Sequence, residues 1–308
     1  MKHTKQSQNL NFIGITCFIV LLLLGNMTYG QIKRDTLRLF IIGNSFSQNA
    51  TTYLDQIAKE NGKILIIGRA EIGGCSLERH WSHTAAFETD STDAKGKPYK
   101  GRSLKLLLSE QPWDIVTIQQ NSYNSSDLQT YQPYARNLYN YVKKHHPAAR
   151  ILLHQTWAYR ADAKKFGRVN ATVDTKSDIE MWEKSRAAYH LVAKQLNVKL
   201  IPVGDAFNMV RASKKHQYKK DASFDFEKPV YPNLPDQTNS LNLGYSWKNK
   251  EVFRFDGNHA NDAGKYLGSL VWYAALFNAS PREIKYTPTT VPVDFAAYLR
   301  IVAKKVSK

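Results

Sequence analysis

The sequence predicts an α/β protein in which helices cover both faces of a parallel β-sheet. Short apolar runs alternate with segments whose apolar residues recur at helical spacing. Within the apolar runs, hydrophobic and polar residues do not alternate, which is typical of strands buried on both faces of a parallel sheet. The predicted strands are LRLFIIG (37–43), ILIIGRA (64–70), DIVTIQ (114–119), RILLHQT (150–156) and KLIPVG (199–204).

The segments between these strands are predicted to be helices. For the first of them, Asn49 or Thr51 is the expected N-cap and Gly62 the expected end, because these residue types favour those positions. The predicted helices are 50–61, 103–110, 130–146, 179–197 and a last helix at 260–278.

Residues 1–30 have the pattern of a secretion signal peptide. Lys2 and Lys5 precede an apolar core, FIGITCFIVLLLL, and GNMTYG supplies small or neutral residues before the expected cut. The core falls short of the roughly 20 residues that span a bilayer, which favours a cleaved signal over a retained anchor. The surroundings of Cys17 do not form a lipobox. We expect an exported protein, periplasmic or extracellular, without stable membrane insertion after cleavage.

The remaining residues, 31–308, are enough for one domain with a large core. They contain one cysteine, Cys75, so no disulfide can form within the mature chain. Loss of the signal lowers the net charge from +17 by the two lysines to +15. The cations are scattered and accompany no nucleic-acid-binding motif, so we expect no nucleic acid partner; the basic surface either solubilises the protein or attracts anionic polymers. The weakly patterned stretch 212–250 is predicted to be an insertion, and the oligomeric state stays open.

The first candidate site residue is Ser45, which follows the strand 37–43 directly. Ligands of open parallel sheets bind beyond the carboxyl ends of the strands. The N-terminus of the following helix favours negative charge there. Ser45 can act as a nucleophile only if a base removes its proton; otherwise Asn44 and Ser45 merely cap a helix.

A candidate base lies near the other end of the chain. FRFDGNHANDAG places Asp256 and His259 three residues apart. In a turn or a first helical turn, this spacing brings both side chains to one side, so that the carboxylate orients one imidazole nitrogen and the other faces outward. Histidine changes protonation near neutral pH, which suits a general base. The alternative is that Asp256 only caps the last helix.

An ester-cleaving serine also needs donors for the oxyanion of its tetrahedral intermediate. EIGGCSLERHW follows the second strand and contains Gly74, where bare backbone can approach a substrate. IVTIQQNSYNSS contains the third strand and the amide side chains of Gln120 and Asn121. These residues are the candidate oxyanion donors, together with the backbone N–H of Ser45.

Together these segments resemble the SGNH (GDSL-like) hydrolase superfamily. IIGNSFS resembles its first block, with Ser45 as nucleophile and Asn44 where many members have Asp. EIGGCS resembles the second block, with Gly74 as the oxyanion glycine, and DGNH resembles the Asp-x-x-His block, with Asp256 orienting the base His259. QQNS stands where the family has Gly-x-Asn-Asp, so the third donor is either Asn121 or Gln120.

The resemblance implies a flavodoxin-like three-layer α/β/α sandwich with a five-stranded parallel sheet in the order 2-1-3-4-5. It also implies a serine esterase that needs no cofactor. The sequence looks most like a secreted bacterial branch related to carbohydrate O-acetylesterases. The expected reaction therefore removes a small acyl group, with acetyl as the expected group, from a small-molecule or polysaccharide ester. The alternatives are a catalytically silent carbohydrate-binding protein on the same scaffold, and a lipase or thioesterase.

Three further residues are expected to contact the substrate: Asn44, His80 and Trp157. Other aromatic residues with faces suited to sugar rings are Tyr159, Trp182 and Trp247. His80 and His83 lie three residues apart, but no carboxylate pattern joins them, so we expect no metal site.

Overall fold

The computed structural model describes residues 36–307, which form one compact unit. The predicted signal peptide lies outside the described residues. Within them, no helix is both long enough and apolar enough to cross a membrane.

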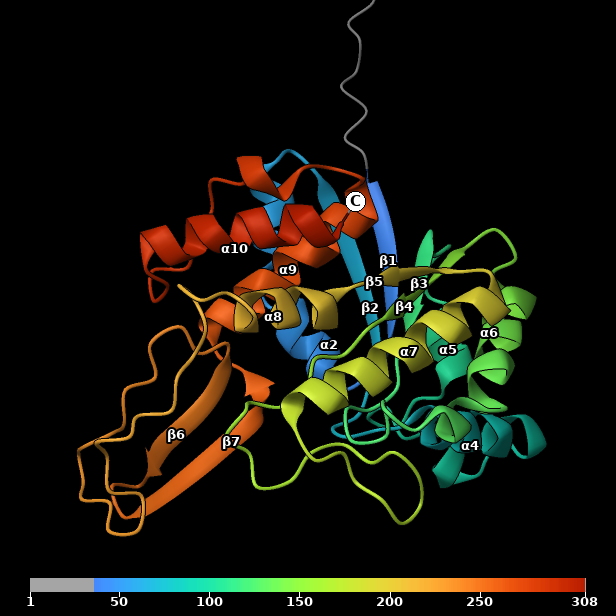
Figure 1. Ribbon diagram of the computed structural model, residues 1–308. Coiled ribbons are helices and arrows are strands. Elements are labelled where there is room, and N and C mark those ends of the chain that lie inside the picture. The colour runs from blue at the N-terminus through green and yellow to red at the C-terminus, as the bar shows by residue number, and fades with distance from the viewer. Residues whose placement is uncertain (1–35, 308) are drawn as a thin grey trace, which may run out of the picture. The chain divides into compact units, whose positions relative to one another are not determined.

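The centre of this unit is a five-stranded parallel sheet in the order β2-β1-β3-β4-β5, which confirms the predicted fold class and strand order. Figure 1 shows the strands of the sheet close together behind α7 and α8, and β1 lies between β2 and β3 in the sheet. Its strands are β1 (Thr36–Gly43), β2 (Ile64–Glu71), β3 (Ile115–Ile118), β4 (Arg150–His154) and β5 (Lys199–Ile201).

Helices form a layer on each face of the sheet because successive side chains of a strand point to opposite faces. Leu39 and Ile41 of β1 belong to one buried cluster, whereas Phe40 and Ile42 belong to the other. The first layer consists of α2 (Ser45–Ala50), α3 (Leu54–Glu60), α8 (Val203–Arg211), α9 (Asp262–Phe277) and α10 (Val293–Val306). The second consists of α4 (Leu77–Thr89), α5 (Leu104–Leu108), α6 (Tyr134–His145) and α7 (Asp178–Leu196). Three short 3-10 helices are Ala94–Gly96, Leu128–Tyr131 and Pro281–Glu283.

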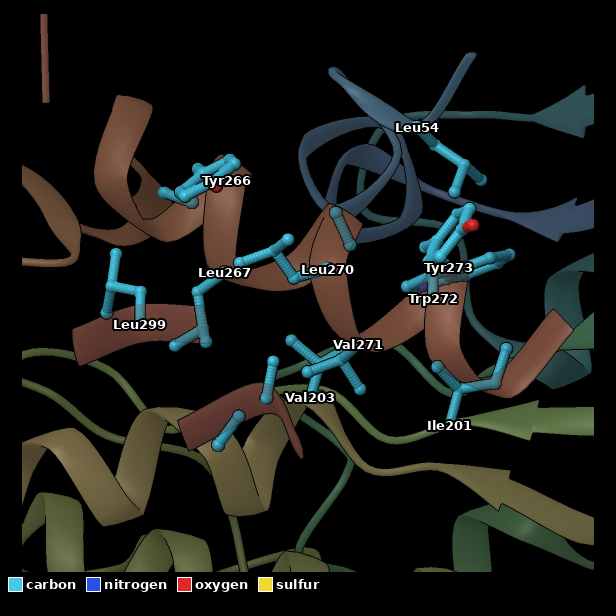
Figure 2. Close-up of a cluster of buried hydrophobic side chains, with 14 of the residues drawn as sticks. Leu54, Ile201, Val203, Tyr266, Leu267, Leu270, Val271, Trp272, Tyr273 and Leu299 are labelled. Carbon is cyan, nitrogen blue, oxygen red and sulfur yellow. The ribbon is translucent and has the colours of Figure 1, made fainter. Parts of the chain in front are cut away.

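Helix α9 is the centre of the first layer. It is apolar on nearly every side, as expected of a helix enclosed by other elements. Figure 2 shows its side chains reaching towards α3, the end of β5 and the start of α8, and α10. The labelled residues are Leu54, Ile201, Val203, Tyr266, Leu267, Leu270, Val271, Trp272, Tyr273 and Leu299.

The predicted helix 50–61 is wrong at its start, because two helices occupy this stretch. Helix α2 begins at Ser45, and its N-cap is Asn44, whose Oδ1 accepts the N–H of Phe46 at 3.0 Å. Thr51 is instead the C-cap of α2. Asn49 accepts the backbone N–H of Ala260 at 2.9 Å, a long-range contact that local sequence does not reveal.

The segment predicted as an insertion leads into a β-hairpin, which the pattern of apolar residues in the sequence did not predict. Residues 212–241 contain no helix or strand, and they continue into β6 (Asn242–Lys248), which pairs antiparallel with β7 (Val252–Ala260). We call residues 212–260 the arm. Figure 1 shows the hairpin extending away from the five-stranded sheet. Helices α4, α8 and α10 were also not predicted.

Candidate active site

Three residues predicted from distant parts of the sequence lie in one hydrogen-bonded row. Ser45 is the first residue of α2, at the carboxyl end of β1, and His259 lies on β7 of the arm. The Oγ of Ser45 is 3.0 Å from Nε2 of His259, 214 residues downstream. On the other side of the ring, Nδ1 of His259 is 2.9 Å from Oδ2 of Asp256. With the proton on Nδ1, the imidazole donates to Asp256 and accepts from the serine hydroxyl.

Asp256 and His259 face the same way because β7 is irregular between them. On a regular strand, residues three apart point to opposite faces. Here Asn242 pairs with Ala260 but Gly244 pairs with Asp256, so three residues of β7 oppose one residue of β6. Such a bulge bends the strand and redirects side chains. The expected turn or helical turn at this position is therefore wrong, and a bulged strand takes its place.

The bulge is closed by Asp256 itself. Its Oδ1 accepts the backbone N–H of His259 at 3.0 Å and that of Asn258 at 3.3 Å. One carboxylate thus fixes the backbone around the histidine with one oxygen and orients the ring with the other.

The charges of this pair support each other. The hydrogen bond from Asp256 raises the pKa of His259 above its ordinary value, against the opposing effect of partial burial. Partial burial acts to raise the pKa of Asp256, but the hydrogen bonds from the side chain and backbone of His259 outweigh it and lower that pKa. Asp256 is therefore ionised at neutral pH, and His259 titrates above the usual imidazole range.

Ser45 and His259 open into a pocket of about 270 Å³. Gly74 and Asn121 line it beside Ser45. Gly74 has a φ of +64°, and the space around its Cα is open, so its backbone is accessible from the pocket. Asn121 donates from Nδ2 to the carbonyl of Gly74 at 3.0 Å, which leaves the second amide hydrogen of that group for a ligand. The other lining residues are Asn44, Phe46, Ser122, Tyr123, Tyr159 and Asn258.

Gln120, the alternative third donor, does not reach this pocket. Its side chain is fully buried, and its Nε2 donates to both the carbonyl and the hydroxyl of Thr130, at 2.9 and 3.1 Å. Its Oε1 accepts the N–H groups of Leu77 and Asn121. Because the amide is fully used to hold loops together, the assignment of Gln120 as an oxyanion donor is wrong.

Asn44 was expected to contact the substrate, but its side chain is 1% exposed and already engaged. Its Nδ2 donates to the carbonyl of Cys75 at 3.0 Å, and its Oδ1, besides capping α2, accepts Nε2 of Gln119 at 2.7 Å. Gln119 in turn accepts from Nδ1 of His154 at 2.6 Å. Asn44 therefore holds the start of α2 from behind.

His80 is also not a substrate contact. It is fully buried on α4, where Nε2 donates to the carbonyl of Gly43 at 3.0 Å and Nδ1 accepts from the hydroxyl of Tyr99 at 2.8 Å. Burial lowers the pKa of His80 to about 4, so the ring is neutral. The side chain supports the end of β1 just before the Ser45 loop.

Trp157 is a core residue rather than a pocket residue. It is 1% exposed and stacks on Phe207, with ring centroids 4.6 Å apart and planes 11° apart. Its Nε1 donates to the carbonyl of Asn258 at 2.8 Å. Its ring also lies 4.3 Å from that of Phe46, the residue after Ser45. His80 and Trp157 are therefore corrected as substrate contacts, whereas Asn44 lines the pocket but has its side-chain amide engaged by protein partners.

Of the other aromatic candidates, only Tyr159 lines the pocket, and its hydroxyl is 3.0 Å from that of Ser122. Trp182 donates to Asp205, and Trp247 donates to the carbonyl of Asn233 on the arm. Sequence reasoning gave Ser122, Tyr123 and Asn258 no role, although Ser122 directly follows Asn121, Tyr123 is the next residue, and Asn258 directly precedes His259.

The described residues contain no group of three or more His, Cys, Asp or Glu side chains placed to hold a metal ion. His83, considered with His80 above, contacts the backbone carbonyl of Lys95 through Nδ1 at 2.7 Å.

The protein is therefore of the α/β class, with a doubly wound parallel sheet and a hydrogen-bonded row of Ser, His and Asp side chains at the carboxyl ends of its strands. The chain belongs to the family described as a domain of unknown function, DUF4886, whose model matches residues 38–228. The matched segment includes Ser45, Gly74 and Asn121 and ends before Asp256 and His259.

Three solved structures are similar to this chain. A DUF4886 family protein from Bacteroides uniformis is 24% identical, with a TM-score of 0.66 over 88% of this chain and 95% of that one. A protein from Slackia heliotrinireducens, provisionally described as an SGNH hydrolase, is 19% identical, with a TM-score of 0.46 over 78% and 98%. A provisionally described GDSL-like lipase from Parabacteroides merdae is 15% identical, with a TM-score of 0.44 over 80% and 98%. The first establishes a shared fold. No protein with a curated description matches the chain.

Proposed function

We propose that this protein is a serine hydrolase of the SGNH type that cleaves carboxylic esters. The observation that carries the proposal is the row of hydrogen bonds from Ser45 through His259 to Asp256, which ends in an open pocket. A serine hydroxyl within 3.0 Å of an imidazole that a carboxylate orients is the arrangement that activates a serine as nucleophile.

The proposed reaction begins when Oγ of Ser45 attacks the ester carbonyl and passes its proton to Nε2 of His259. The oxyanion would be held by the N–H groups of Ser45 and Gly74 and by Nδ2 of Asn121. The first N–H of α2 has no partner within the helix, which suits this role. His259 then protonates the departing alcohol oxygen, leaving an acyl group on Ser45. Water, deprotonated by His259, releases the carboxylic acid and restores the hydroxyl.

The proposed substrate is a carbohydrate that carries a small acyl group such as acetyl. The pocket is small and combines amide and hydroxyl groups with the rings of Tyr123 and Tyr159, a combination suited to a sugar ring. The predicted signal peptide would place the reaction in the periplasm or outside the cell, where acylated polysaccharides are accessible. A series of esters from acetate to palmitate separates this substrate class from a lipase or thioesterase, because only the latter would prefer long acyl chains.

The test is hydrolysis of p-nitrophenyl acetate combined with labelling by a fluorophosphonate probe, which reacts only with an activated serine. Ser45→Ala is expected to abolish both while the protein remains folded. Ser109→Ala, at the exposed end of α5, is the matched control and should retain both. Undiminished turnover by Ser45→Ala would refute the assignment. Absence of labelling in the wild type together with glycan binding would favour a silent carbohydrate-binding protein instead.

A further inference from the structure

We propose that Arg160 is a positioning residue that braces the bulge of β7 and so keeps His259 within reach of Ser45. The inference rests on the proposed function and assigns a role to the arm, which carries half of the row of catalytic groups. It concerns the segment 157–162, which follows β4 and runs beneath the bulge.

The bulge releases backbone carbonyls from the β-ladder, and buried carbonyls need other partners. The carbonyl of Gly257 accepts the backbone N–H of Arg160 at 2.8 Å and Nδ2 of Asn242 at 2.9 Å. The next carbonyl, that of Asn258, accepts Nε1 of Trp157 at 2.8 Å. Both residues between Asp256 and His259 are therefore held from the segment 157–162.

The side chain of Arg160 fixes that segment to the arm. It is 4% exposed and forms a two-pronged ion pair with Asp162, with Nε–Oδ1 and Nη2–Oδ2 distances of 2.7 and 2.9 Å. Its Nη1 donates to Oε1 of Gln237 at 2.9 Å and to Oγ of Ser240 at 3.3 Å. One guanidinium thus joins the segment beneath the bulge to the irregular part of the arm.

Aromatic rings of the arm surround the same guanidinium. Its central carbon lies 4.1 Å from the ring centroid of Tyr218, 5.2 Å from that of Tyr245 and 4.9 Å from that of Phe255. Tyr245 and Phe255 are partners on β6 and β7, and Phe255 directly precedes Asp256. These contacts place the cation against aromatic rings from both strands of the hairpin.

An ion pair at this depth is a costly way to gain stability, since apolar side chains of similar size often serve as well or better. What arginine adds is a planar fork whose donors define directions. A brace for a catalytic strand requires fixed directions, because a displacement of about 1 Å in the reacting groups can lower a rate by about 100-fold.

The brace also reaches the nucleophile. Trp157 holds the carbonyl before His259 and contacts the ring of Phe46, which follows Ser45. A shift of the segment 157–162 would therefore move both reaction partners relative to each other.

The test compares Arg160→Met with Arg211→Met. Arg211 forms a similar ion pair, with Asp178 at 2.8 Å, and lines the same cavity as Arg160, but its hydrogen bonds go to α7 and α8 rather than to the arm. We expect Arg160→Met to lower the fluorophosphonate labelling rate and kcat by about 10- to 100-fold with little change in KM. Arg211→Met should stay near the wild-type values. Equal labelling of Arg160→Met and wild type, or equal losses in both variants, would overturn the brace.

A second variant covers the case in which Arg160→Met does not fold. Trp157→Phe retains an aromatic ring against Phe207 and removes the donor to Asn258 together with part of the indole. Its labelling rate should fall by about tenfold in folded protein, and an unchanged rate would contradict the proposal.

The proton NMR resonance of the His259 Nδ1–H gives a readout that does not depend on turnover. It should be resolved downfield in the wild type and in Arg211→Met, and broadened or shifted in Trp157→Phe. An unchanged resonance in Trp157→Phe would argue against the brace even if the wild type proved inactive. If the resonance is lost in Trp157→Phe and the fluorophosphonate probe does not label the wild type, the proposed positioning role is supported and the proposed hydrolase activity is refuted.

Discussion

Replacing Asp256 by asparagine tests the chemistry of the site most directly. Asparagine has the same shape, and its Oδ1 can still accept the backbone N–H groups of Asn258 and His259. Its amide nitrogen, however, would replace the oxygen that lies 2.9 Å from Nδ1 of His259. Two N–H donors would then face each other. We expect the imidazole to move its proton to Nε2, from where it donates to Ser45 and no longer accepts the serine proton.

The expected loss follows from this change of tautomer. Wrong-tautomer variants of Ser-His-Asp hydrolases lose about 10⁴ in kcat, which corresponds to about 5 kcal/mol of barrier at 1.36 kcal/mol per decade. A second effect concerns pH. The reaction requires neutral His259, so the rate rises with pH through the pKa of that ring. Asp256 raises this pKa in the wild type, so its replacement should move the acidic limb to lower pH.

The assay is kcat for p-nitrophenyl acetate across neutral pH, with the unfolding transition of each variant measured alongside. A loss of less than about tenfold at every pH, equal to about 1.4 kcal/mol, would show that Asp256 does not set the tautomer. An acidic limb displaced to higher pH would contradict the sign of its electrostatic effect.

Two further predictions concern the oxyanion donor and the buried histidines. Asn121→Ala should lower kcat by about 10²- to 10³-fold with nearly unchanged KM, and an unaltered kcat would remove Asn121 from the oxyanion site. His80 and His154 are buried and neutral, with pKa values of about 4 and about 3, so their contribution to the free energy of unfolding is complete above their ordinary pKa of 6.5 and falls as the pH drops below it. For His80 alone the loss by its folded pKa is about 3 kcal/mol, and urea unfolding at stepwise lower pH that shows constant stability would contradict this.

The sheet could be predicted from the sequence because its strands contain apolar runs, most clearly β3, which is buried throughout. Burial on both faces makes such a run recognisable without knowledge of its neighbours, although the edge strand β2 exposes Ile64 and Ile66. Helices that depend on tertiary packing were missed. Helix α4 begins at Leu77 within a stretch that reads as a polar loop, and only its contacts with the second core cluster and the cap from Ser76 reveal it.

The positions of Ser45, Asp256 and His259 were also predictable, because each lies in a short block with a recognisable pattern. Their local geometry was not. The spacing of Asp256 and His259 suggests a turn, whereas a bulged strand brings them together. The carbonyls of this strand are satisfied by Trp157 and Arg160, and Trp157 lies 101 residues before its acceptor Asn258. The local sequence pattern around Asp256 and His259 does not indicate hydrogen-bond donors that lie so far away in the chain.

The side chains predicted to touch substrate are engaged with protein partners instead, for one shared reason. Asn44, His80 and Trp157 are polar or aromatic residues close to strand ends, where ligands bind. The same location also needs buried donors and acceptors, because the strand ends leave backbone groups to satisfy. The sequence does not distinguish a side chain that faces the pocket from one that supports it from behind.

The two halves of the row of catalytic groups are held by different parts of the fold. Behind Ser45, the buried side chains of Asn44, Gln119 and His154 fix the start of α2 to the sheet. His259 instead belongs to an arm with no place in that sheet, so its position depends on separate contacts. These are the N–H of Ala260 bound by Asn49 of α2, and the bulge bound by the segment 157–162. Because the contacts behind Ser45 differ from those that hold the bulge of β7, a change in the arm can move His259 while Ser45 keeps its own position.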